Sequence, residues 1–232
     1  MNFKKASPII ICGMHGGGTS YATKLLRFCG LFVGFDAGNR DDRKWHESKA
    51  MKDINIGIQK AMWGTELTHR NMARLADKYV SIMKSSGGDL GRFSNAAEMR
   101  AAAACTFSAR EAIGGQWGWK DPRNGITLGE WLKIFPNARV LSIHRKWSKG
   151  ASWSTSSGRL FAMSSPRVRY IHEYPMALEL SRKYKDVGVF RAKFERMISD
   201  PLYFNTVLEY VGIDPLNTKE FDDLLKKTKC EV

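Results

Sequence analysis

Apolar runs and helical patterns alternate along both ends of this chain of 232 residues. Residues 8–13 form a continuous apolar run that is typical of a buried parallel strand, and residues 19–29 have the periodicity of a helix. Because strands alternate with helices, we predict an α/β fold with three α/β/α layers and a central, mainly parallel sheet. The same patterning predicts further strands at 117–119, 139–144 and 187–190, and further helices at 48–63, 127–135, 147–156, 166–184, 201–211 and 218–227.

Between the two halves, the sequence has helical periodicity and offers no candidate catalytic or binding residues. We interpret residues 65–115 as a helical insertion within a single domain that spans residues 1–232. Such an insertion is either a lid over a site or a set of helices that only pack. On the preceding helix, Met51, Ile54, Ile58 and Met62 recur at helical spacing, which indicates a buried face.

The amino-acid composition gives the chain a strong positive charge. The chain has 37 Lys and Arg residues against 23 Asp and Glu, a formal net charge of +14, which favours an anionic partner. The four cysteines have no metal-ligand spacing, and a chain of this size needs no disulfides, so we expect a reduced, cytoplasmic setting. No apolar stretch is long enough to span a bilayer.

A glycine-rich turn follows the first predicted strand. Residues 13–20 read Gly-Met-His-Gly-Gly-Gly-Thr-Ser, directly before the first predicted helix. Glycines let the backbone turn tightly with its N–H groups pointing inward, and a helix N-terminus favours an anion. The spacing is close to a Walker A loop and predicts a P-loop NTPase-like fold, but Thr19 stands where that motif requires lysine. We therefore predict a phosphate site built from backbone and hydroxyl groups, rather than an ordinary ATPase or kinase.

A second charged segment follows the predicted strand at 117–119. Lys120 and Arg123 flank Asp121-Pro122, and the proline keeps Asp121 out of a helix. Ligands of parallel sheets bind beyond the carboxyl ends of the strands. An ammonium there can neutralise charge that develops on a transferred group. The alternative is a plain turn with solvated basic neighbours.

A third segment begins where the strand at 139–144 ends. Arg145 follows that strand, and Ser152 and Ser154 follow on a helical pattern. An arginine with serine hydroxyls is a good receptor for a phosphate monoester. Basic residues far outnumber acidic ones between residues 139 and 193, so the positive charge is concentrated beside this segment.

In this order, the three segments resemble the sulfotransferases that use 3′-phosphoadenosine-5′-phosphosulfate (PAPS). Residues 13–20 are similar to that family's 5′-phosphosulfate loop, with matches at Gly13, Gly18, Thr19 and Ser20. Residues 119–123 are similar to its Lys-Asp-Pro segment, and residues 135–145 to the lead into its 3′-phosphate strand. Residues 190–201 and 208–213 resemble the acidic helix entry and the ending of its C-terminal part.

The resemblance implies in-line transfer of a sulfuryl group from PAPS to a hydroxyl or amine, with release of 3′-phosphoadenosine-5′-phosphate (PAP) and without a metal. The acceptor would be a small molecule, a glycan or a peptide, and residues 65–115 would cap the acceptor side. Lys120 would contact the sulfuryl group, and Arg145 with Ser152 would hold the 3′-phosphate. The implied donor-binding residues are His15, Gly16, Gly17, Gly18, Thr19, Ser20, Arg123, Arg145, Ser152 and Ser154.

The chain departs from the family pattern at the first loop. The family usually has Arg or Lys where Gly16 and Gly17 stand, so one positive charge is missing. Lys120, Lys24 or His15 are the candidates that could replace it. The serine after Arg145 is also displaced, because Ser152 comes one position early and Trp153 takes the place of the family's serine.

Transfer to an alcohol also needs a group that accepts the hydroxyl proton. His46 and Glu47 are the candidates, since the family often carries a glutamate on this segment. The alternative is that Glu47 caps the helix at 48–63. The histidines and aspartates show no metal-ligand spacing.

Three other functions stay open. Gly16 and Gly17 would also suit a nucleotide-binding module that is catalytically weak or inactive. A P-loop kinase is disfavoured by Thr19 and by the lack of a clear aspartate for Mg²⁺ after a strand. Trp147 and Trp153 lie among basic residues and would permit nucleic-acid stacking, the least favoured alternative.

Overall fold

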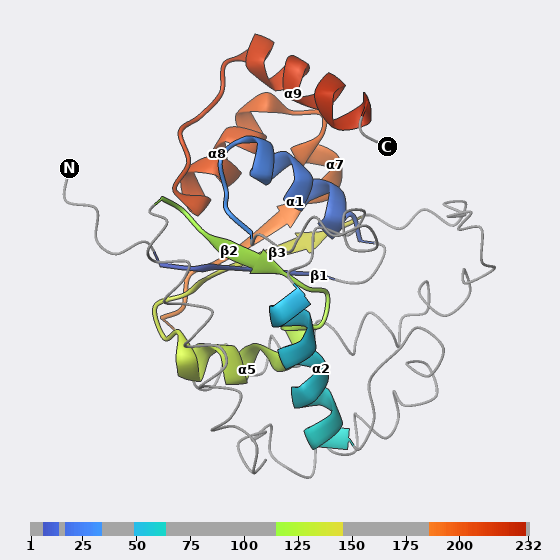
Figure 1. Cartoon of the computed structure of the whole chain (residues 1–232). Coiled ribbons are helices and arrows are strands. Elements are labelled where there is room, and N and C mark those ends of the chain that lie inside the picture. Colours follow the sequence, from blue (N-terminus) through green and yellow to red (C-terminus); the bar gives the residue numbers. More distant parts are fainter. Residues whose placement is uncertain (1–6, 14–16, 34–48, 64–114, 146–185, 231–232) are drawn as a thin grey trace.

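A computed structural model describes residues 7–13, 17–33, 49–63, 115–145 and 186–230. Within these residues, the strands form one four-stranded parallel sheet in the order β2-β1-β3-β4 (Figure 1). The strands are β1 (Ile9–Gly13), β2 (Gly118–Lys120), β3 (Arg139–His144) and β4 (Val189–Lys193). Since β1 lies between β2 and β3, the segments that follow all three strands meet at one edge of the sheet.

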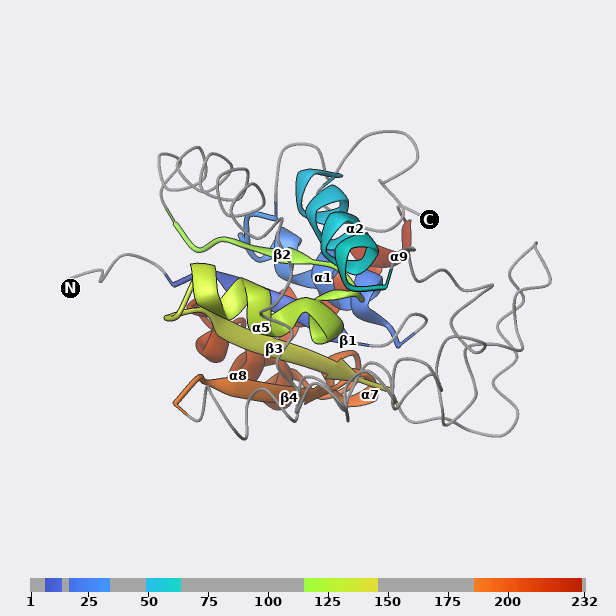
Figure 2. The same ribbon diagram turned by 90° about the horizontal axis from the view of Figure 1, so that it is seen from below.

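Helices cover both faces of the sheet (Figures 1 and 2). One face carries α1 (Thr19–Phe28), α7 (Phe194–Met197), α8 (Pro201–Val211) and α9 (Thr218–Cys230). The other face carries α2 (Lys49–Trp63) and α5 (Asn124–Ile134). The predicted three-layer α/β fold is therefore confirmed.

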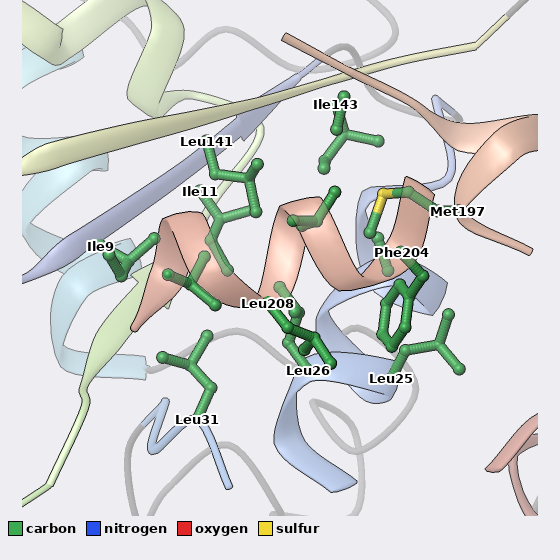
Figure 3. Packing of buried hydrophobic residues seen from close by; sticks show 14 of the residues in the cluster. Ile9, Ile11, Leu25, Leu26, Leu31, Leu141, Ile143, Met197, Phe204 and Leu208 are labelled. Carbon is green, nitrogen blue, oxygen red and sulfur yellow. The ribbon is translucent and has the colours of Figure 1, made fainter. Parts of the chain in front are cut away.

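The main core lies between the sheet and the helices α1 and α8 (Figure 3). Ile9 and Ile11 of β1 pack there against Leu25 and Leu26 of α1 and Phe204 of α8, all fully buried. The opposite face is aromatic: the Trp119 and Trp131 rings lie 4.8 Å apart, and the Phe135 ring packs against both. Alternate residues of each strand thus face two different cores, as the apolar runs predicted.

Two elements begin more than one residue away from their predicted starts. The helix predicted at 127–135 begins instead at Asn124, as α5. The Asp121-Pro122 turn starts it early, because Asp121 accepts bonds from two backbone N–H groups, one at its carboxylate from Arg123 (2.8 Å) and one at its carbonyl from Asn124 (3.0 Å). The strand predicted at 187–190 lies two to three residues later, as β4.

Several predicted helices cannot be compared with the structure, because they lie outside the described residues. Almost all of the insertion at 65–115, and the helices at 147–156 and 166–184, lie outside the described residues. Among the described residues, no helix is long and apolar enough to cross a membrane.

Candidate functional site

The candidate site begins where α1 starts, directly after the glycine loop. Gly17 is buried and Gly18 caps the helix, with a φ of 86° in the left-handed region that favours glycine. Thr19 and Ser20 are the first two residues of α1, and Thr19 is 3% exposed. The predicted strand and helix N-terminus are therefore present, whereas Met14, His15 and Gly16 of the turn between them lie outside the described residues.

Lys120 points from the end of β2 toward this helix start. Its Nζ donates a hydrogen bond to Ser20 Oγ at 3.1 Å, and only 1% of the residue is exposed. Lysine is among the residues least often fully buried, since an ammonium removed from water must find polar partners. The structure thus brings a buried positive charge to the first turn of α1, from a segment 100 residues further along the chain.

Arg123 lies on the same turn but is held by its neighbour. Its Nη1 is 3.2 Å from Asp121 Oδ1, and the Asp121 side chain is fully buried. Asp121 also accepts the backbone N–H of Arg123, and its own N–H donates to the Ile11 carbonyl at 3.3 Å. These contacts fix the turn against β1. The alternative of solvated basic neighbours does not hold for these side chains, because Lys120 and Arg123 are both buried.

A buried amide network anchors the turn to both β1 and α2. Asn124 donates to the Ile11 carbonyl at 2.8 Å and accepts from Asn55 at 2.9 Å. Asn55 in turn accepts from Thr127 at 2.6 Å and from the Trp131 indole at 2.8 Å. Sequence analysis missed both asparagines. The available signal was Asn55 itself, a polar residue adjoining the apolar stripe that includes Ile54.

Arg145 follows β3 and reaches the same edge of the sheet. Its Cζ lies 5.1 Å from the centroid of the Phe194 ring, and its Nε lies 4.0 Å from Glu195 Oε1. The Phe194 ring also lies against Gly18, because a Cβ at Gly18 would come within 2.4 Å of ring atom Cδ2. Gly18, Phe194 and Arg145 are therefore in one contiguous group. Phe194 was not predicted.

Lys24 does not serve this site. Its Nζ donates at 2.8 Å to the carbonyl of Thr228, near the end of α9, and the residue is 9% exposed. A cation there stabilises the negative end of the α9 dipole. The hypothesis that Lys24 replaces the missing loop charge is wrong, since its ammonium binds a different helix.

The end of β1 holds a buried thiol, that of Cys12. Burial raises the pKa of the Cys12 thiol to about 12, although the hydrogen bond with Ser142 opposes that rise. Ser142 Oγ also lies 2.9 Å from His144 Nε2. Cys12 is therefore protonated at neutral pH and is not a nucleophile. Among the described residues, no group of His, Cys, Asp and Glu could hold a metal ion.

The structure thus unites part of the predicted site. Gly17, Gly18, Thr19, Ser20, Lys120, Arg123 and Arg145 lie around the carboxyl ends of β1, β2 and β3. His15, Gly16, His46, Glu47, Ser152 and Ser154 lie outside the described residues.

Comparisons with known proteins give a distant likeness in fold. No family model matches the chain, and no curated protein matches it. A comparison of structures finds similarity to a crystal structure of a sulfotransferase from Mycobacterium tuberculosis, with a TM-score of 0.46 and 15% sequence identity. That alignment covers 94% of this chain and 70% of the other.

Proposed function

We propose that this protein is a sulfotransferase that uses PAPS as donor and a hydroxyl or amine as acceptor. The observation that carries the proposal is the buried contact between Lys120 and Ser20. It supplies a positive charge at the start of α1, where Gly16 and Gly17 provide none.

The fit to the donor rests on residues at both ends of the site. The N-terminus of α1 offers backbone N–H groups and the Thr19 and Ser20 hydroxyls, which suit a 5′-phosphosulfate. Arg145, beyond β3, is a fork of donors that suits the 3′-phosphate. Arg123 is less suited to a direct contact, because its guanidinium is engaged by Asp121.

The bound donor supplies the sulfuryl group. Transfer breaks the bond between sulfur and the bridging phosphate oxygen, forms a bond to the acceptor oxygen or nitrogen, and leaves PAP and one proton. Lys120 neutralises the negative charge that develops on the oxygens of the transferred group, which is the main task of the protein in such transfers. His46 and Glu47 remain the proposed acceptors of the proton.

A catalytically weak or inactive module that binds the same nucleotide is the second candidate. Gly16 and Gly17 favour it, since they leave the charge at the first turn of α1 to Lys120. Such a module would bind PAP without transferring the sulfuryl group of PAPS to any acceptor.

Thermal shift with different nucleotides tests the proposal. We expect PAP to raise the melting temperature more than ADP or ATP does, with or without Mg²⁺. Arg145→Ala should abolish this shift. Arg27→Ala is the matched control, because Arg27 is an exposed arginine in the last turn of α1, at the opposite end of the helix from the site.

Two results would count against the proposal. The absence of any shift with PAP refutes it, and a larger, Mg²⁺-dependent shift with ATP favours a kinase instead. If Arg145→Ala and Arg27→Ala lower the PAP-induced thermal shift equally, the role of Arg145 is refuted. The effect would then come from the net charge of the protein alone.

A further inference from the structure

Phe194 contacts two separate parts of the proposed donor site. It is the first residue of α7, directly after β4, and is 6% exposed. One part of the ring lies so close to Gly18 that a Cβ there would meet ring atoms Cδ2, Cε2 and Cγ at 2.4 to 2.7 Å. The Arg145 guanidinium carbon lies 5.1 Å from the centroid of the same ring.

Both contacts constrain their partners. The ring stands where any side chain at position 18 would be, so the backbone at the start of α1 rests on it directly. A guanidinium is attracted to an aromatic ring at this separation, which limits the directions available to Arg145. Tyr21 of α1 packs edge-on against the ring with centroids 6.0 Å apart, and this contact fixes the ring in turn.

The two partners belong to different anion sites of the proposed function. Gly18 belongs to the loop proposed for the 5′-phosphosulfate, and Arg145 is proposed for the 3′-phosphate. A single rigid ring between α1 and the end of β3 therefore sets the separation of the two sites. A leucine would fill much of the space but would lose the attraction to Arg145.

We infer that Phe194 is a positioning residue that holds the loop and Arg145 at the separation of two phosphates on one ligand. It selects nucleosides with phosphates on both the 3′ and 5′ positions over those with a 5′-phosphate alone. This inference rests on the proposed function.

The test is a pair of dissociation constants, for PAP and for adenosine 5′-phosphate, measured by calorimetry. We expect Phe194→Leu to weaken PAP binding by about fivefold to thirtyfold, the range that corresponds to the loss of a partly desolvated cation–π contact. Binding of adenosine 5′-phosphate should change by less than about twofold, because that ligand does not use Arg145. Phe194→Tyr keeps the ring and should restore the preference for PAP.

A second phenylalanine provides the matched control. Phe221 is 3% exposed and packs against Phe204, with ring centroids 5.5 Å apart, in the interface between α8 and α9. Phe221→Leu removes the same atoms from another buried position and should leave the ratio of the two constants unchanged. In an Arg145→Ala background, Phe194→Leu should no longer alter the ratio.

The outcomes separate this inference from the proposed function. If the unmodified protein binds neither ligand, the proposed function fails and the inference falls with it. If the protein prefers PAP and Phe194→Leu keeps the same ratio as Phe221→Leu, the inference alone is overturned. A loss of preference in Phe194→Tyr equal to that in Phe194→Leu also overturns it, since the ring would then be irrelevant.

Discussion

Lys120 Nζ lies 3.1 Å from Ser20 Oγ, in a position where the lysine is 1% exposed. This contact joins the end of β2 to the first turn of α1. It places a positive charge at Ser20, the residue after Thr19, which stands where the Walker A pattern has its lysine. The charge comes from the end of β2, and not from the loop itself. The charge that Gly16 and Gly17 do not provide is thus available from β2.

Gly18 should tolerate no side chain. Gly18→Ala adds the clash with Phe194 to the cost of a left-handed alanine, so we expect about 1–3 kcal/mol of destabilisation beyond the backbone cost. The matched control is Gly30→Ala, where φ is +102° but nothing lies within 4 Å of the new Cβ. That control should lose only about 1–2 kcal/mol. Urea unfolding of both variants measures the difference, and equal losses would contradict the close contact.

Asn55 should be structurally essential although it is polar. Asn55→Leu leaves the Trp131 indole N–H without its hydrogen-bond acceptor in a buried site, at a cost of about 1–3 kcal/mol. Lys60→Leu places a leucine at an exposed position of the same helix and should change the unfolding free energy by less than about 0.5 kcal/mol. Chemical denaturation measures the unfolding free energy of both variants. An Asn55→Leu variant as stable as Lys60→Leu would refute the stabilising role of the hydrogen bonds at Asn55.

Lys24 should matter for stability and not for nucleotide binding. Lys24→Met removes the bond to the Thr228 carbonyl while it keeps the apolar stem, so we expect a loss of about 1–2 kcal/mol. The PAP-induced thermal shift should remain. Loss of that shift at unchanged stability would restore Lys24 as a site residue.

Asp200 should make stability depend on pH. The hydrogen bond from the Arg196 guanidinium, and then that from the Tyr203 backbone N–H, hold the pKa of Asp200 below its ordinary value of 3.8. Because the folded-state pKa is the lower one, the stabilisation is complete above the unfolded-state pKa and is lost as pH falls through the folded-state value.

Asp200→Asn keeps a good helix N-cap at α8 and removes only the charge. The melting temperature of the unmodified protein should therefore exceed that of the variant at neutral pH, and the gap should close as the pH falls below the ordinary pKa of 3.8. A gap that does not narrow in acid would refute the assigned cause.

The apolar run at Ile9 to Cys12 was sufficient to predict β1, because these residues are buried and carry no charged side chain. For α8, the proline at its start and Gly212 at its C-cap are also local features of the sequence. The start of α5 was not predicted, since it depends on Asp121, whose carboxylate and carbonyl accept the backbone N–H groups of Arg123 and Asn124.

The polar contacts of the interior depended on partners that are remote in sequence. Whether Lys24 binds the loop or α9 depends on Thr228, and whether Asn55 is buried depends on Trp131. Phe194 likewise looked like any core aromatic residue until Gly18 and Arg145 were placed beside it. Such contacts arise from tertiary packing, which the periodicity of one chain does not encode.

The most direct test of the role of Lys120 is the rate at which the protein converts PAPS to PAP with a panel of phenolic, sugar and peptide acceptors. Lys120→Met keeps the length and apolar stem of the side chain, so its PAP-induced thermal shift reports whether the donor site survives. We predict measurable PAP formation by the unmodified protein and a rate at least about 100-fold lower in Lys120→Met. Equal rates in the two proteins, or no PAP formed by the unmodified protein, would contradict the central claim that Lys120 provides the positive charge for sulfuryl transfer.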